Sequence, residues 1–141
     1  MSTWKRRLFQ TGRDGGARDL GLLVLRVGFG FSLAFAHGHG KLMRFLDGNF
    51  KFADPIGLGS AASLGLASFA EFVCAIAVIV GLATRWACVP IMILLSVAFF
   101  VVHGDDPFAD KEKAFVFLTA FIAIFLAGPG RFSLDGYLGK K

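Results

Sequence analysis

Two charged residues, Arg26 and Glu71, lie within otherwise apolar runs of this sequence. An ionised group surrounded by hydrocarbon is costly, so such residues usually find a partner or line a functional cavity. Each lies about ten residues from the end of its run that faces one common side of the membrane. At ~1.5 Å per residue, both residues are then about 15 Å below that membrane surface. We therefore predict that Arg26 and Glu71 form a buried charge pair. The pair would either fix only the register of two helices or belong to a proton or substrate site.

Histidines and charged residues form a second group where the apolar runs end. Histidine titrates nearest to physiological pH, so it can exchange a proton with a bound ligand. His37 and Lys41 are four residues apart and could share a helix face, whereas His37 and His39 could not. The group is typical of a polar mouth that admits a ligand, or of solvated loops, and we predict no metal site. This predicted outer polar cluster consists of His37, His39, Lys41, His103 and Glu112.

Arg85 and Arg131 follow apolar runs on the side opposite to that cluster, where they could dock a soluble partner. Cys74 and Cys88 form neither a CxxC motif nor a metal-ligand pattern. A hairpin about residues 84–85 would separate them by about 10 Å along the helix axis, whereas a disulfide needs Cα atoms within roughly 7 Å. We predict that both cysteines are unpaired packing residues.

The elements that must position these residues are membrane helices. Apolar residues make up 55% of the 141 residues and charged residues 18%, and the mean hydropathy is +0.66. A soluble domain of this size could not bury so much apolar surface, which excludes a cytosolic globular enzyme, a disulfide-stapled secreted domain and a disordered tail. Backbone groups in lipid need internal partners, so the apolar runs must be helices. The predicted fold class is all-α, an integral membrane four-helix transmembrane bundle in one domain (1–141), with spans at 20–36, 61–82, 86–102 and 114–128.

The loops and their charges predict an orientation. Four spans put the basic arm 1–19, the short connection at residues 83–85 and the tail 129–141 on one side. That side carries nine Lys and Arg residues against five on the other. The positive-inside rule then places both termini in the cytoplasm, and it explains the net charge of +5 better than nucleic-acid binding does. We expect the 24-residue segment His37–Ser60 to fold back against the mouth of the bundle.

The order of several short motifs resembles the DoxX family. The motifs are His37-Gly38-x-Gly40-Lys41, Glu71, Gly81-Leu82-x-Thr84-Arg85, His103 with Phe108 and Glu112, and Gly128-Pro129-Gly130-Arg131-Phe132-Ser133-Leu134-Asp135. The resemblance covers Leu20 to Asp135. DoxX-like proteins are small four-span proteins of the bacterial inner membrane, related to the small subunit of thiosulfate:quinone oxidoreductase. The resemblance therefore implies an inner-membrane location and quinone-linked redox chemistry, and it assigns no catalytic residue.

Three classes of function stay open. The first is the membrane subunit of a quinone-linked oxidoreductase with a bound quinone. The second is a non-enzymatic scaffold that docks a soluble redox partner, and the third is a small transporter, which would need to form a homo-oligomer. The sequence carries no haem, flavin or iron–sulfur motif, so an electron path would need a partner or a bound quinone.

Overall fold

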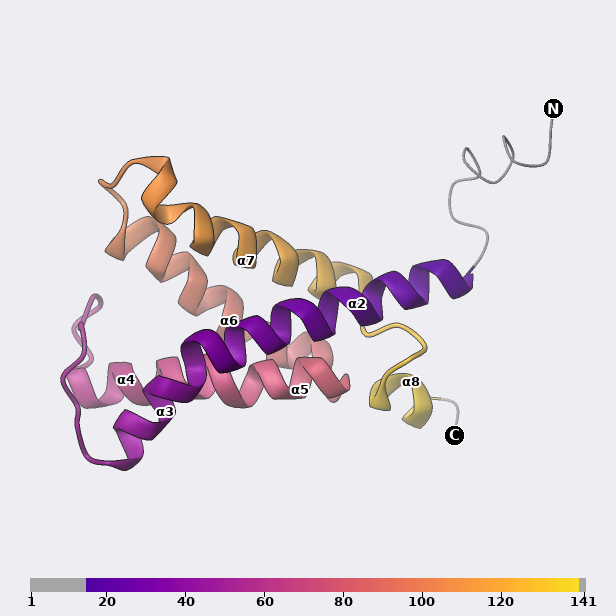
Figure 1. Cartoon of the computed structure of the whole chain (residues 1–141), viewed down its shortest axis with the longest axis horizontal. Coiled ribbons are helices and arrows are strands. Elements are labelled where there is room, and N and C mark those ends of the chain that lie inside the picture. Colours follow the sequence, from indigo (N-terminus) through magenta and orange to yellow (C-terminus); the bar gives the residue numbers. More distant parts are fainter. Residues whose placement is uncertain (1–14, 140–141) are drawn as a thin grey trace.

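Every regular element within residues 15–139, the part of the chain that this computed structural model describes, is helical (Figure 1). The predicted all-α fold is therefore confirmed for that part. Several of the predicted cytoplasmic cations lie outside the described residues, namely Lys5, Arg6, Arg7, Arg13, Lys140 and Lys141.

The helices form four long rods, three of which contain a π-helical segment. The first rod consists of α2 (Gly15–Leu33), η1 (Ala34–Gly38) and α3 (His39–Leu46). The second consists of α4 (Ser60–Ser68), η2 (Phe69–Cys74) and α5 (Ala75–Val80). The third consists of α6 (Thr84–Val97) and η3 (Ala98–Val102), and it is followed by α7 (Phe108–Ala127) and the short α8 (Leu134–Leu138).

Three of these rods are long and apolar enough to cross a membrane. They are Gly15–Leu46 with 32 residues, Ser60–Val80 with 21 and Thr84–Val102 with 19. The fourth rod, α7, has 20 residues, but its first two turns carry the four charges of residues 110–113. The structure therefore supports three of the four predicted spans as membrane-crossing helices.

Two predicted boundaries need correction. The first rod ends at Leu46 instead of residue 36, because residues 37–46 contain no proline and form an amphipathic helix that continues α2 without a break. The loop that follows is therefore residues 47–59, and His37 and His39 lie on a helix. The second concerns α7, whose apolar run starts at residue 114. The sequence predicts that the helix extends backward through residues 111–113, and the structure confirms this and starts α7 at Phe108, directly after Pro107.

The predicted hairpin between the second and third rods is confirmed. Gly81 adopts a left-handed conformation with φ of 74°, and the Leu82 N–H donates to the Ala77 carbonyl at 2.9 Å. This arrangement ends α5 as a Schellman motif. Thr84 then starts α6, so the two rods are antiparallel neighbours.

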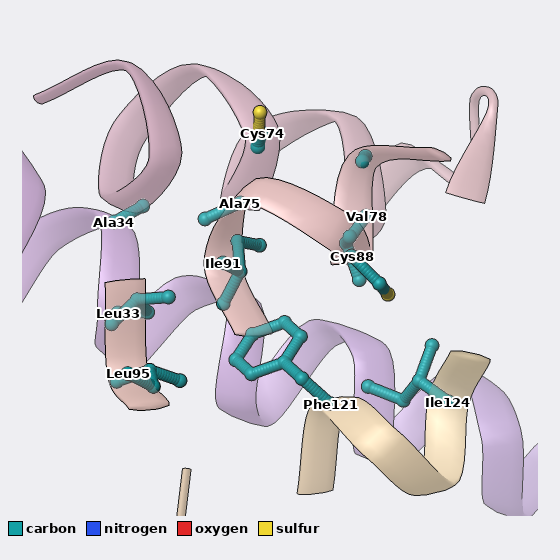
Figure 2. Close-up of a cluster of buried hydrophobic side chains, with 11 residues drawn as sticks. Leu33, Ala34, Cys74, Ala75, Val78, Cys88, Ile91, Leu95, Phe121 and Ile124 are labelled. Atoms are coloured by element: carbon teal, nitrogen blue, oxygen red, sulfur yellow. The ribbon is translucent and has the colours of Figure 1, made fainter. Parts of the chain in front are cut away.

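The core lies where the rods meet (Figure 2). Leu33 comes from α2, Val78 from α5, Ile91 from α6 and Phe121 from α7, and each is at most 1% exposed. Cys74 and Cys88 are free thiols buried in the same cluster, and their sulfurs point away from each other in Figure 2. Their predicted role as packing residues is confirmed.

The loop 47–59 folds back onto the helices, as expected from the sequence. Its Asp54 carboxylate accepts hydrogen bonds from the Leu58 and Gly59 N–H groups at 2.8 and 2.9 Å and from the Ser63 hydroxyl at 2.9 Å. The hydrogen bond from Gly59 is the largest cause that lowers the pKa of Asp54. Asp54 thus ties the loop to the first turn of α4.

Candidate functional site: a polar cavity at the outer end

A polar cavity of about 380 Å³ is lined by residues of α2, η1, α3, η2, α6, η3 and α7 and by His103. The segments η1, α3 and η3 lie at the end of the bundle opposite to the start of α2 and to α8 (Figure 1). We call this cavity the outer cavity, after the predicted outer polar cluster. Three rods contribute polar side chains to its wall, and His103, directly after the third rod, adds another. The lining residues are Leu33, His37, Lys41, Glu71, Leu95, Ala98, His103, Asp110, Lys113, Ala114 and Phe117.

All three π-helical segments border this cavity. His37 lies in η1, Glu71 in η2 and Ala98 in η3. The His103 N–H donates to the Ala98 carbonyl at 3.0 Å, which is the five-residue spacing of a π-turn. Such segments are rare and occur frequently at functional sites, since the extra residue redirects the side chains that follow it. No pattern in the sequence predicted them.

Gly38 brings η1 and η2 into backbone contact beside the cavity. A Cβ atom at Gly38 would lie 2.5 Å from both the carbonyl carbon and the oxygen of Glu71. Any side chain at position 38 would therefore push the two segments apart. Close packing against the Glu71 backbone thus explains why glycine occupies position 38 in the motif His37-Gly38-x-Gly40-Lys41.

Glu71 forms an ion pair with Lys41 across the wall of the cavity. The Glu71 side chain is 8% exposed and that of Lys41 24%, so the pair is largely withdrawn from solvent. Lys41 Nζ also lies 5.8 Å from the centre of the Phe52 ring, which adds a cation–π contact. The lysine thus neutralises the carboxylate while its other side faces the loop 47–59.

The predicted pairing of Arg26 with Glu71 is wrong. Arg26 is fully buried, and its Nη1 donates to the carbonyls of Val78 and Ile79 at 3.1 Å each. Those carbonyls belong to the last turn of α5, where carbonyls lack the usual i+4 donors and carry partial negative charge. The Val78 carbonyl also accepts from the Gly81 N–H at 3.2 Å. The depth estimate failed because the first rod continues to Leu46, and Arg26 lies level with Val78 and Ile79, about two turns along the second rod from Glu71.

Arg26 also binds the C-terminal segment, which folds back over the hairpin. Its Nη2 donates to the Phe132 carbonyl, whereas its buried Nε makes no hydrogen bond within the described part of the chain. The Asp135 N–H donates to the Gly81 carbonyl at 2.9 Å. The motifs around Gly81 and Asp135 are therefore two halves of one contact.

The carboxylate of Asp135 completes this contact at the start of α6. It accepts from the Ala83 N–H, the Thr84 N–H and the Thr84 hydroxyl, each at 2.8 Å. Burial alone would raise the pKa of Asp135, but the hydrogen bonds from Thr84 and Ala83 and the charge of Arg26 outweigh it and lower the pKa. Sequence reasoning did not assign Asp135 a role, although its position in a motif was the available signal.

The structure brings together three of the five residues of the predicted outer polar cluster. His37, Lys41 and His103 line the outer cavity. His39 is exposed and packs against Phe72 with ring centres 6.1 Å apart, and Glu112 is exposed and is not among the lining residues.

The sequence analysis missed two charged residues that line the cavity, Asp110 and Lys113. They are three residues apart, and that spacing puts them on one face of α7. Of the two cavity histidines, His37 packs edge-on against Phe117 at 5.8 Å, and His103 Nδ1 lies 2.7 Å from Asp106 Oδ2.

Arg85 and Arg131 lie at the opposite end of the bundle, and both are exposed. Arg85 donates to the Leu126 carbonyl at 3.4 Å. The guanidinium of Arg131 lies 5.2 Å from the centre of the Phe132 ring, and its backbone N–H donates to Asp19 at 3.1 Å. Their predicted role in docking a partner stays a prediction, as does the absence of a metal. Among residues 15–139, no three His, Cys, Asp or Glu side chains gather as a metal site would require.

Comparison with known proteins identifies the family. No curated protein and no solved structure matches this chain. The DoxX family model matches residues 21–104, which is more than half of the 141 residues. The match includes Arg26, Gly38, Lys41, Glu71 and His103, and it ends before the C-terminal motif. With its long apolar helices, this chain is a multi-pass membrane protein that belongs to the DoxX family.

Proposed function

We propose that this DoxX protein is the membrane subunit of a quinone-linked redox system and that the quinone ring binds in the outer cavity. The observation that carries the proposal is the cavity itself, where protonatable side chains from three rods and from His103, which directly follows the other rod, converge on one space beside apolar walls. A quinone needs an apolar slot for its ring and a hydrogen-bonding group near its carbonyls. Leu33, Leu95 and Phe117 supply the former, and His37 and His103 the latter.

The chemistry divides between this chain and a redox partner. Reduction of a quinone to the quinol takes up two electrons and two protons. The cavity offers proton donors in His37 and in His103, which Asp106 supports. No cysteine, tyrosine or tryptophan lines the cavity, so the proposal assigns electron delivery to a soluble partner and proton delivery to this chain.

The proposal includes a topology. We take α7 as the fourth span, because the whole helix of 20 residues is about 30 Å long at 1.5 Å per residue, which matches the hydrocarbon core of a bilayer. The membrane is the bacterial inner membrane, and both termini are cytoplasmic. A cysteine placed at Asn49 should then react with an impermeant thiol reagent applied outside the cell, whereas one at Gly139 should not. Reaction of Gly139→Cys instead would reverse the orientation.

Quinone binding is tested on the purified protein in nanodiscs, with a short-chain benzoquinone and a short-chain naphthoquinone as probes. His37→Phe keeps the ring contact with Phe117, and His103→Leu keeps a side chain of similar bulk. Each removes a hydrogen-bonding group worth about 1.5 kcal/mol, so each should raise the Kd roughly tenfold. His39→Phe is the matched control, since His39 lies on the same helix but outside the cavity. Equal affinity in wild type, control and the His37/His103 double variant would remove this site.

The scaffold is the alternative, and the exposed Arg85 and Arg131 favour it. It expects the histidine variants to be silent and the double variant Arg85→Gln/Arg131→Gln to lose a soluble redox partner. Partner loss with unchanged quinone binding would support the scaffold over the quinone site.

A further inference from the structure

A second cavity of about 280 Å³ lies between α4, η2 and α6, beneath part of the loop 47–59. We call it the apolar slot. Its wall consists of apolar side chains apart from Ser63, whose hydroxyl is already bonded to Asp54. The slot therefore offers no free polar group and suits a hydrocarbon ligand.

The lining residues of the slot span a considerable length of the bundle. Ser63 lies 17 residues before the end of α5, and Pro90 lies six residues after the start of α6. Because the two rods are antiparallel neighbours, the levels of Ser63 and Pro90 differ by about 16 Å at 1.5 Å per residue. A volume of about 280 Å³ stretched over this length fits one extended chain better than a compact ring.

One side of the slot is open to the surroundings of the bundle. Leu66, Phe69 and Ile93 line it and are 54%, 48% and 61% exposed. These residues belong to the second and third rods, two of the three rods that have the length and hydropathy of membrane spans. A chain could therefore enter sideways from the bilayer, while Phe52 and Leu58 of the loop close the slot near the membrane surface.

Cations flank the end of the slot at Phe52. Arg44 donates to the carbonyl of Lys51, the residue next to Phe52. Two carboxylates lie between residues 41 and 59. Asp54 already accepts three hydrogen bonds, and Asp47 is the residue that caps the end of α3. Since Lys41 pairs with Glu71, Arg44 and Lys51 are the cations left to meet an anionic group at this end.

We propose that the apolar slot binds an acyl chain of an anionic phospholipid, whose headgroup phosphate contacts Arg44 and Lys51. The site is independent of the quinone proposal, because it lies on the other face of η2 and α6. Ala70 and Leu94 face the slot, whereas their neighbours Glu71 and Leu95 face the outer cavity. A bound chain would therefore support the wall that the two cavities share.

Lipid retention tests this site. The protein is purified in mild detergent, equilibrated with equal amounts of phosphatidylglycerol and phosphatidylcholine, and analysed by native mass spectrometry. Wild type should retain phosphatidylglycerol at least fivefold over phosphatidylcholine. Leu66→Trp and Ile93→Trp each fill the slot and should lower that retention at least fivefold. Leu126→Trp is the control, since Leu126 is 69% exposed and does not line the slot.

The headgroup contact has its own variant. Arg44→Gln/Lys51→Gln should abolish the preference for phosphatidylglycerol and leave the retention of phosphatidylcholine unchanged. Circular dichroism shows whether each variant keeps its helices. Because tryptophan is placed at two separate positions, the test still works if one of these variants does not fold. Equal retention in Ile93→Trp and Leu126→Trp, or no preference between the two lipids in wild type, would overturn the proposal.

Discussion

The contact between Gly38 and Glu71 predicts that alanine at position 38 destabilises the protein. A Cβ atom there would lie 2.5 Å from two backbone atoms of Glu71 and 2.7 Å from the Phe72 nitrogen, whereas ordinary contacts lie at 3.4–4 Å. The backbones of η1 and η2 would have to separate by about 1 Å, and overpacking of this kind costs about 1–3 kcal/mol. Against that cost, alanine in a helix gains about 1 kcal/mol over glycine.

Gly40→Ala isolates the steric part of this effect. Gly40 lies two residues further along the same rod, and a Cβ there meets nothing within 4 Å. Both variants share the gain in helix propensity, so Gly38→Ala should be less stable than Gly40→Ala by about 1–3 kcal/mol. Reversible unfolding in mixed micelles, followed by circular dichroism, measures the difference. Equal stability of the two variants would refute the close approach of η1 and η2.

Three further predictions concern the charged groups. Arg26→Met should lower the free energy of unfolding by about 3–5 kcal/mol, since it removes three charge-assisted hydrogen bonds of about 1.5 kcal/mol each, and adding Glu71→Gln should give a simple sum in the same unfolding assay. Lys41→Met and Glu71→Gln should instead be non-additive in a double-mutant cycle, because these two residues form the ion pair. The lowered pKa of Asp135 means that its stabilisation is present above its ordinary value of 3.8 and is lost as pH falls through the lowered pKa. Asp135→Asn should lower the free energy of unfolding by about 1 kcal/mol at neutral pH. The variant should also show a smaller fall in Tm between pH 4 and pH 2 than wild type, and an equal fall would contradict the role given to Asp135.

Composition and hydropathy were sufficient to predict the helical class and the three membrane-crossing rods. Apolar runs of this length have few alternatives once backbone groups must be satisfied within lipid. The tight hairpin was equally accessible, because residues 83–85 leave room for nothing longer. The shared face of His37 and Lys41 followed from their spacing of four residues, and both line the outer cavity.

The partners of the buried charges could not be predicted in the same way. A depth estimate needs the ends of each helix, and the first rod runs ten residues beyond its apolar run, to Leu46. The hydrogen-bond partners of Arg26 are also backbone carbonyls, which every residue carries and no sequence pattern reveals. The π-helical segments were inaccessible for a related reason, since they depend on how neighbouring rods pack.

The two buried charges therefore have different meanings, although they look alike in the sequence. Both terminal nitrogens of Arg26 are committed to carbonyls of α5 and of the C-terminal segment, so this guanidinium acts as a structural clamp. Glu71 is paired instead with a lysine that borders an open cavity, beside histidines that can exchange protons. Under the proposed function, a ligand would compete for this lysine without unfolding the bundle, whereas Arg26 is held by its hydrogen bonds to α5 and the C-terminal segment. We therefore expect substitutions at the outer cavity to change ligand binding, and substitutions of the charged residues near the hairpin to change the stability of the fold.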